Sequence, residues 1–343
     1  MSTDVRIRPG LHPALRDAAR RGRALALLVL AAIASILLVP AEVSAQDHSR
    51  DILVGRLIGE PRSVIIRRED TLIRLAMRYD IGFVELRAAN PGVDVWVPQP
   101  GARLVLPTMH IAPPADGAAI IVNRAELRLY AYPADGPIWS APISLGRDGY
   151  ETPLGEIPIG EKKANPAWYP TAAHRAESPA LPRVVPPGPD NPLGRHALRL
   201  GHTEYLLHGT NRPDSIGREV SRGCIRLSPG DIAWLYDHVA RGAIVRIIDA
   251  PAKLAQGEDG RLYLEIAPSR DQVAALDMGQ TPPDDPFIGV EDMLMARAGD
   301  LASRIDWSEV ARIARERRGV PEPITPPVTR RRPGASLTSA SSG

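Results

Sequence analysis

The chain has 343 residues, with 42 Lys and Arg against 40 Asp and Glu, and hydrophobic residues make up 44% of it. This length predicts about two domains with tails, the hydrophobic share excludes a wholly disordered chain, and 24% charged residues exclude a polytopic membrane protein. Residues 1–45 hold six arginines and three acidic residues, so the remainder carries 36 basic against 37 acidic residues, and no nucleic-acid partner is expected.

An apolar run near the N-terminus predicts export. Residues 24–39 carry no charge, follow the basic stretch Arg20–Arg23, and lead to the small residues Val43-Ser44-Ala45. A basic flank, an apolar core and a small-residue exit are typical of a secretory signal, so residues 1–45 are expected to be a signal peptide, with an uncleaved membrane anchor as the alternative. In either case we expect residues 46–343 to work in the periplasm or cell envelope.

The next segment predicts a very small domain. Residues 46–62 are polar and are interpreted as a leader. Residues 63–107 have the pattern strand, helix, helix, strand, in which a second short helix at 83–89 follows an amphipathic first one. The apolar face of the first helix is formed by Leu72, Leu75, Ala76 and Tyr79.

Residues 63–107 resemble a LysM module, a family that binds the glycan chains of peptidoglycan. The matching residues are Asp70-Thr71-Leu72, Ile81-Gly82, Glu85-Leu86, Ala89-Asn90-Pro91, Pro100-Gly101 and Leu104–Pro107. The resemblance implies glycan binding. A βααβ unit that only packs against its neighbour is the alternative, because small folds recur with different functions.

A second, larger domain is expected after a linker at 108–117. Residues 118–250 are rich in short runs with strand character, separated by Gly, Pro, Asn and Asp, which favours mainly antiparallel β structure. In one of these runs Leu127, Leu129 and Ala131 alternate with Arg128, Tyr130 and Tyr132, which predicts a half-buried strand.

The last third of the chain carries a clear helix signal and a polar tail. Ser228-Pro229-Gly230-Asp231 supplies an N-cap serine and an early proline, and Ile232, Leu235, Tyr236 and Val239 follow at helical spacing. This helix is expected to pack behind Cys224. Residues 251–318 are predicted to form an extension with a strand and a helix, and the Pro-rich and Ser-rich residues 319–343 a disordered tail.

The only cysteine, Cys224, has no partner within the chain. In an exported protein it is an intermolecular bridge, a buried inert thiol or a working nucleophile. A nucleophilic thiol needs a nearby base, and His208 stands 16 residues earlier at the end of a predicted strand. The flexible loop between them could return the chain beside that strand, and the carbonyl of Gly209 could hold the second ring nitrogen.

Residues around Cys224 suit the remaining needs of acyl transfer. Gly223 lets a substrate carbonyl approach, and its N–H together with that of Cys224 could face an oxyanion. Ser221 is expected to fix the turn, and Asn211 is taken as a substrate-binding residue. Arg222 and Arg226 flank the thiol, where they could lower its pKa and receive substrate carboxylates, although both could be plain surface arginines. No metal-ligand set or phosphate loop is visible, so no metal or cofactor is expected.

His208-Gly209-Thr210 with Ser221-Arg222-Gly223-Cys224-Ile225-Arg226-Leu227 resembles the catalytic motif of the L,D-transpeptidases, which cross-link peptidoglycan. Further matches are Thr152-Pro153-Leu154-Gly155, Asn165-Pro166-Ala167-Trp168 and Gly188–Gly194. The resemblance covers about 118–250. It implies a mainly β, sandwich-like catalytic domain with few helices, in which Cys224 is the nucleophile, His208 the base and Gly209 the orienting carbonyl.

The sequence departs from the family pattern at two positions. Arg222 stands where many members have histidine, and Arg226 where some have asparagine, which leaves the acceptor and the carboxylate contacts open. The hypothesis is an L,D-transpeptidase whose partners are peptidoglycan stem peptides and glycan strands, with a second stem or an outer-membrane protein as acceptor. An L,D-carboxypeptidase and a non-catalytic wall-binding protein are the alternatives. An exported cysteine peptidase lacks papain-like signatures.

Overall fold

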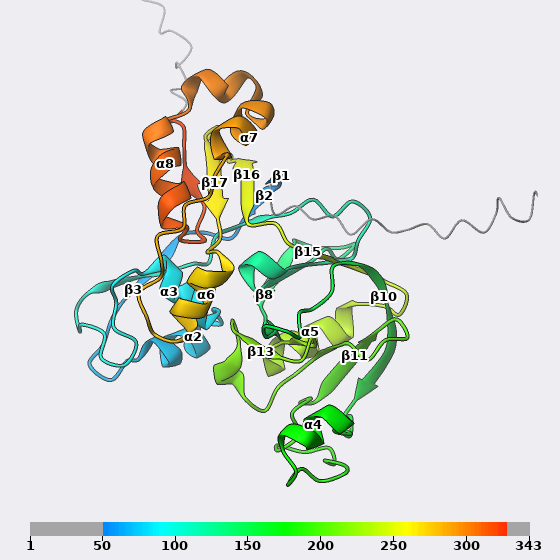
Figure 1. The fold of residues 1–343 in the computed structure, drawn as a ribbon. Coiled ribbons are helices and arrows are strands. Elements are labelled where there is room, and N and C mark those ends of the chain that lie inside the picture. The colour runs from blue at the N-terminus through cyan, green and yellow to red at the C-terminus, as the bar shows by residue number, and fades with distance from the viewer. Residues whose placement is uncertain (1–50, 328–343) are drawn as a thin grey trace, which may run out of the picture. The chain divides into compact units, whose positions relative to one another are not determined.

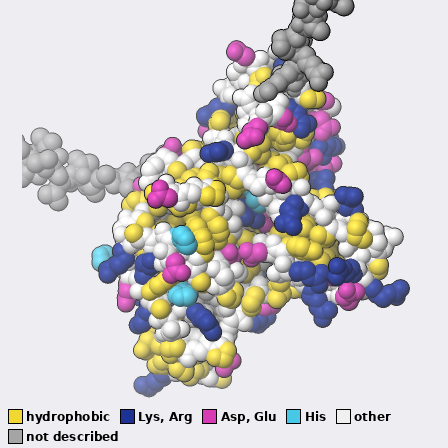
Figure 2. All heavy atoms as spheres, turned by 180° about the vertical axis from the view of Figure 1, so that it is seen from behind, with side chains coloured by type: hydrophobic (Ala, Val, Ile, Leu, Met, Phe, Trp, Pro, Cys, Tyr) yellow, Lys and Arg dark blue, Asp and Glu magenta, His cyan; other side chains and the backbone are white. Residues whose placement is uncertain are grey.

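The computed structural model describes residues 51–327, so the expected signal peptide or anchor at 1–45 lies outside the described residues (Figure 1). Within the described range no helix is both long and apolar enough to span a bilayer. Figure 2 shows basic and acidic side chains interspersed with hydrophobic ones over one face, which is consistent with the near balance of charge in the sequence.

The LysM-like segment has the predicted βααβ order. Strands β3 (Arg62–Ile65) and β4 (Arg103–Leu106) pair antiparallel, and helices α2 (Leu72–Tyr79) and α3 (Phe83–Ala89) lie between them in the chain. Helix α2 begins where the Thr71 side chain accepts a hydrogen bond from the Arg74 N–H, and it ends at Asp80 in the left-handed conformation. Its buried face packs with α3 and β4, and the buried Leu72, Leu75, Leu86 and Leu104 belong to one hydrophobic core that continues into the larger domain.

The larger domain is built on an eight-stranded sheet, which confirms a mainly β fold. Neighbouring strands in this sheet are antiparallel except for the parallel pairs β14–β12 and β15–β6. In spatial order the strands are β14 (Ile225–Arg226), β12 (Leu206–His208), β11 (His196–Leu200), β10 (Gly155–Ala164), β15 (Ile244–Ile248), β6 (Ile120–Asn123), β7 (Arg128–Ala131) and β8 (Trp139–Pro142). A separate parallel pair joins β9 (Leu145–Gly146) to β13 (Glu219–Ser221), and two 3-10 turns lie at Arg124–Glu126 and Pro213–Ser215.

Helix α5 (Pro229–His238) forms as predicted. The Ser228 side chain accepts a hydrogen bond from the Asp231 N–H, and proline occupies the first turn. Its buried Ile232 and Leu235 belong to the same hydrophobic core as Ile225 and Leu227, so the helix supports the strand that follows Cys224.

The interpretation of residues 46–62 as a polar leader is wrong for their second half. Strand β1 (Ile52–Val54) pairs parallel with β16 (Ala252–Gln256), and β2 (Arg56–Ile58) pairs antiparallel with β5 (His110–Ala112) inside the expected linker. These strands were missed because each is only three residues long and its partner lies far away in the sequence.

The C-terminal extension is more structured than predicted. Strands β1, β16, β17 (Leu262–Ile266) and β18 (Glu322–Pro323) form a four-stranded sheet. The tail was expected to be disordered from residue 319, but β18 pairs with β17 and Ile324 is fully buried. The helical elements here are α6 (Arg270–Asp277), α7 (Val290–Arg297), a 3-10 turn at Gly299–Arg304 and α8 (Trp307–Glu316).

Strand β7 differs from its predicted half-buried pattern, because all four of its residues are buried. Arg128 meets the carboxylate of Glu85 from α3, with both oxygens at 2.7 Å from Nη2, and the Tyr130 hydroxyl lies 3.1 Å from the Lys253 ammonium of β16. The face that was expected to be exposed is therefore covered by two distant parts of the chain.

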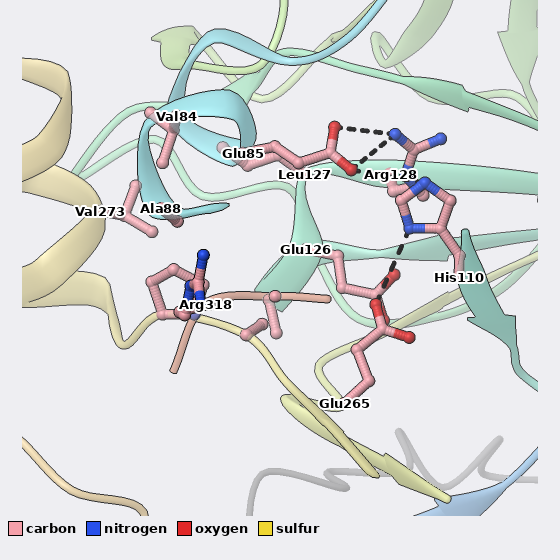
Figure 3. Close-up of a pocket in the computed structure, with 14 residues that line it drawn as sticks. Val84, Glu85, Ala88, His110, Glu126, Leu127, Arg128, Glu265, Val273 and Arg318 are labelled. Atoms are coloured by element: carbon pink, nitrogen blue, oxygen red, sulfur yellow. Dashed lines mark hydrogen bonds and ion pairs between the residues drawn. The ribbon is translucent and has the colours of Figure 1, made fainter. Parts of the chain in front are cut away.

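These contacts belong to a cluster of buried charges that joins the LysM-like segment, the large sheet and the extension, part of which is drawn in Figure 3. We name it the seam cluster: Glu85, His110, Glu126, Arg128, Lys253 and Glu265. The Lys253 ammonium lies 2.6 Å from Glu126 and 3.0 Å from Glu265, and His110 lies between the carboxylates of Glu85 and Glu265, at 3.5 and 3.8 Å. The cavity beside it has a volume of only about 20 Å³, room for about one water molecule.

Candidate active site

The two residues proposed for catalysis come from neighbouring strands of the large sheet. His208 is the last residue of β12, and Cys224 immediately precedes β14. The strands are parallel, with Leu207 opposite Ile225 and His208 opposite Arg226. Since side chains alternate between the faces of a strand, His208 and Arg226 share one face, and Cys224, two residues before Arg226, is expected on the same side. Among the described residues the thiol makes its hydrogen bond to the Glu204 carbonyl and none to His208.

His208 is held in one orientation by the next residue along the chain. Its Nδ1 lies 2.6 Å from the carbonyl oxygen of Gly209, so Nδ1 carries a proton and donates it, and Nε2 is left as the basic nitrogen. The side chain is buried, and burial together with the charge of Arg226 lowers its pKa to about 4 from 6.5. The imidazole is therefore neutral near pH 7 and able to accept a proton.

Cys224 is half-buried, and its Sγ lies 3.9 Å from the carbonyl oxygen of Glu204. Burial raises the pKa of the thiol, while the Leu206 backbone and the Arg226 charge oppose that rise. Arg226 lowers the pKa of the thiol, as expected, but desolvation outweighs it, so the thiol pKa is raised overall. With a raised thiol pKa and a lowered imidazole pKa, both the Cys224 thiol and the His208 imidazole are neutral near pH 7.

The turn before the cysteine has a shape that only glycine adopts easily. Gly223 has φ +96°, and a Cβ added there would lie 2.5 Å from the ring of Tyr205. Ser221 fixes this turn through its hydroxyl, which donates to the Cys224 carbonyl at 2.5 Å and accepts from the Gly223 N–H at 3.1 Å. The Thr152 hydroxyl donates to the Gly223 carbonyl at 3.0 Å.

This geometry changes the expected oxyanion donors. The Gly223 N–H, which was expected to face an oxyanion, is already bonded to Ser221. The Cys224 N–H donates to no protein acceptor within residues 51–327, and it remains the backbone donor at this turn.

The two flanking arginines have different surroundings. Arg222 forms an ion pair with Glu177 of helix α4 (Ala172–Glu177), and its guanidinium lies 4.5 Å from the Tyr150 ring centroid. Its charge is therefore already compensated. Arg226, half-buried beside His208, lines a cavity, and its Nε is buried without an acceptor. Sequence reasoning missed Glu177 and Tyr150, since neither lies in a motif with the cysteine.

Asn211 is exposed and donates a hydrogen bond to the Asp190 carbonyl at 3.1 Å, so it ties two loops together near the end of β12. The structure thus places His208 beside Gly209 and opposite Arg226, and Cys224 in the turn fixed by Ser221 and Gly223, while Arg222 and Asn211 are engaged by neighbouring loops. Among the described residues, no group of three or more His, Cys, Asp or Glu side chains is arranged to hold a metal ion.

Comparisons with known proteins agree with both sequence resemblances. The family model of the L,D-transpeptidase catalytic domain matches residues 117–247, and that of the LysM domain matches residues 64–107. The chain is 43% identical over 220 residues to the probable L,D-transpeptidase ErfK/SrfK of Salmonella typhimurium, covering 62% of this chain and 71% of that one. It is 42% identical over 222 residues to the probable L,D-transpeptidase YcfS of Escherichia coli, covering 62% and 69%.

Among solved structures, L,D-transpeptidase 3 from Mycobacterium tuberculosis matches with a TM-score of 0.29 and 18% identity, over 59% of this chain and 97% of that one.

Proposed function

Because the chain belongs to the L,D-transpeptidase family, we propose that it transfers peptidoglycan stem peptides through a thioester on Cys224. The observation that carries this proposal is the pairing of β12 with β14. The proposal is supported by the register, in which His208 lies opposite Arg226, two residues after Cys224, and by the Nδ1 bond to Gly209, which leaves Nε2 as the basic nitrogen. A thiol beside an oriented base is the arrangement that cysteine acyl transfer needs.

In the first step, Sγ of Cys224 attacks the carbonyl carbon of the diamino acid at stem position three, at its L-to-D bond. The thiol proton passes to Nε2 of His208, since the resting pair is neutral. The Cys224 N–H is the backbone donor available to the oxyanion. Collapse of the tetrahedral intermediate breaks the C–N bond, and the imidazolium gives its proton to the amine of the departing D-alanine.

In the second step, an acceptor amine attacks the thioester and His208 removes its proton. The C–S bond breaks, and the thiolate takes the proton back from the imidazolium. A side-chain amine of a second stem gives a 3–3 cross-link, and an amine of a protein gives protein attachment. Water in place of the amine gives L,D-carboxypeptidase activity on the same residues.

The place of action is the cell envelope in this proposal. It is supported by the apolar run at 24–39 and its small-residue exit, and by the LysM domain, a family whose members bind peptidoglycan glycan. Fractionation of cells that produce the full chain tests it. We expect the protein in the envelope fraction, and recovery in the cytosol would contradict the export signal.

The chemistry is tested by incubating the purified protein with disaccharide tetrapeptides and analysing the products by mass spectrometry. We expect loss of D-alanine with dimers or, if water is the acceptor, with tripeptides. Cys224→Ala is expected to abolish both products and the acylation of the protein by a carbapenem. Unchanged turnover in Cys224→Ala would rule out the thioester route, and a folded wild type with neither turnover nor adduct would favour a non-catalytic wall-binding protein.

A further inference from the structure

A cavity of about 460 Å³ lies between the LysM domain and the catalytic domain, within the range of about 300–1,000 Å³ that is typical of ligand sites. One wall comes from the LysM domain and the other from the loop that joins His208 to Cys224, with the end of α6 closing one side. Its lining includes Trp96, Arg212, Arg218 and Arg226.

The two walls are joined by main-chain hydrogen bonds. The N–H groups of Phe83 and Val84, at the start of α3, donate to the carbonyls of Ile216 and Gly217 at 3.2 and 3.3 Å. Gly217 has φ +79°, and a Cβ on it would lie 2.3 Å from the Cα of Gly82, so only glycine permits this approach. The LysM domain is thus docked on the loop that leads into the catalytic motif.

The charge in the cavity is not balanced. Arg212 pairs with Asp214 at 3.0 Å, and Arg218 pairs with Asp277 at 3.0 Å. Arg226 forms no ion pair with any carboxylate among the described residues, and its Nε is buried without an acceptor. A half-buried guanidinium without an ion-pair partner is a ready partner for a carboxylate. It also stands opposite His208 in the strand register, and its charge interacts with the Cys224 thiol, so Arg226 is the residue that connects this cavity to the candidate active site.

The LysM wall offers a contrasting surface. The Trp96 side chain is 68% exposed although it lines the cavity. Its loop is held in place because the Asp94 carboxylate accepts the N–H groups of Trp96 and Val97, and the Val95 carbonyl accepts the Leu72 N–H. An exposed indole presents a flat apolar face beside a polar N–H, which suits stacking on a sugar ring.

We propose that this cavity binds the donor as a glycopeptide, with a sugar of the glycan against Trp96 and a free carboxylate of its stem on Arg226. The LysM domain is then one wall of the donor site and not only a wall anchor. The inference rests on the proposed function, since it places the stem beside Cys224. It follows from the joined walls, the uncompensated Arg226 and the exposed indole, which together match an amino sugar linked to an acidic peptide.

The first test compares two donors, the free tetrapeptide and the same tetrapeptide linked to a disaccharide, in wild type and Trp96→Ala. We expect the wild type to show a kcat/KM about tenfold higher for the linked donor, and Trp96→Ala to lose that preference. Trp96→Phe is expected to restore part of it. Val97→Ala, in the same loop but outside the cavity lining, is the matched control and is expected to behave as wild type.

Carbapenem acylation of Cys224 separates this inference from the proposed function. It reports the thiol chemistry without a glycan, and it is expected to be the same in the wild type and in the control Val97→Ala. If the wild type is neither acylated nor active on any donor, the proposed function fails. If it is acylated and active but shows no preference for the linked donor, or if Trp96→Ala keeps the preference, the proposed glycopeptide site is wrong.

The second test concerns the carboxylate. Arg226→Met is expected to lower kcat/KM for stems with free carboxylates by about 10- to 100-fold, and amidation of those carboxylates is expected to have a similar effect on the wild type. In the variant, amidation should then have little further effect. Independent, multiplying losses from the mutation and from amidation would overturn the assignment of the carboxylate to Arg226.

Discussion

Two regions of the molecule bury a histidine among charged groups, and they do so to different ends. In the seam cluster His110 lies between the carboxylates of Glu85 and Glu265. In the active site His208 lies opposite Arg226 and on the same face as Cys224. Burial lowers the pKa of both imidazoles, well below the ordinary value for His110 and to about 4 for His208.

The difference lies in what surrounds each ring. Every charge of the seam cluster has an opposite partner, and the adjoining cavity has room for about one water molecule. Opposite His208 lies Arg226, whose Nε has no acceptor and which borders a cavity of about 460 Å³, and the half-buried Cys224 precedes Arg226 by two residues. A lowered pKa alone therefore does not identify a catalytic histidine. The proposal for His208 rests instead on the half-buried Cys224 and the uncompensated charge of Arg226 in the same part of the sheet.

The difference between the two sites is tested most strongly by replacing each histidine in turn. His208→Gln is expected to slow acylation of Cys224 by a carbapenem by about 10²- to 10⁴-fold, because the thiol proton loses its acceptor. His110→Gln is expected to leave the acylation rate within a few-fold of wild type. Time-resolved mass spectrometry of the adduct measures both. Equal losses in the two variants would show that the seam cluster also contributes to the chemistry.

The second prediction concerns stability, for which we expect the larger effect in the seam cluster. Glu85→Gln leaves Arg128 buried without its anionic partner, which is expected to cost about 3–5 kcal/mol in the free energy of unfolding. Asp259→Asn, at the partly exposed pair with Arg261, is expected to cost no more than about 1 kcal/mol. Urea unfolding of the full chain measures both. A loss below about 1 kcal/mol for Glu85→Gln would mean that the seam cluster does not join the domains.

Local signals explain which parts of the fold could be predicted from the sequence. The Thr71 and Ser228 caps and the apolar spacing that follows each of them were sufficient for α2 and α5. The burial of Arg128 and Tyr130 could not be predicted, because these side chains are covered by helix α3 and strand β16. Strand β16 lies more than 100 residues further along the chain. An alternating strand pattern is the same whether its polar face meets water or a buried ion cluster.

In the candidate site, too, only the residues with a local sequence signal could be predicted. The spacing of His208 and Cys224, together with the family resemblance, was enough to propose the pair. The bond from the Gly223 N–H to Ser221 and the ion pair between Arg222 and Glu177 depend on the path of the turn and on the position of α4. Trp96 could not be predicted as a binding residue from the sequence, because only the structure shows the cavity that it lines.

A third prediction uses the pH dependence of stability. The pKa of His208 is about 4 in the folded protein and 6.5 as the ordinary value, so the unfolded chain binds the additional proton between these pH values. The contribution of His208 is therefore fully present above pH 6.5 and is lost as the pH falls to about 4, by about 3 kcal/mol. His208→Gln is expected to remove this part of the slope. An unchanged slope in the variant would mean that the ring is not buried as described.

The smallest effect concerns the ionisation of the thiol itself. Because burial raises the pKa of Cys224, alkylation by iodoacetamide is expected to speed up steadily with pH through the neutral range and to reach no plateau below about pH 9. Arg226→Met should slow it further at a given pH, since the Arg226 charge favours the thiolate. Seam-cluster variants such as His110→Gln should leave the profile unchanged. A plateau at low pH would instead reveal a preformed thiolate–imidazolium pair, in which the proton has moved before the substrate binds. His208 and His110 would then differ in charge as well as in surroundings.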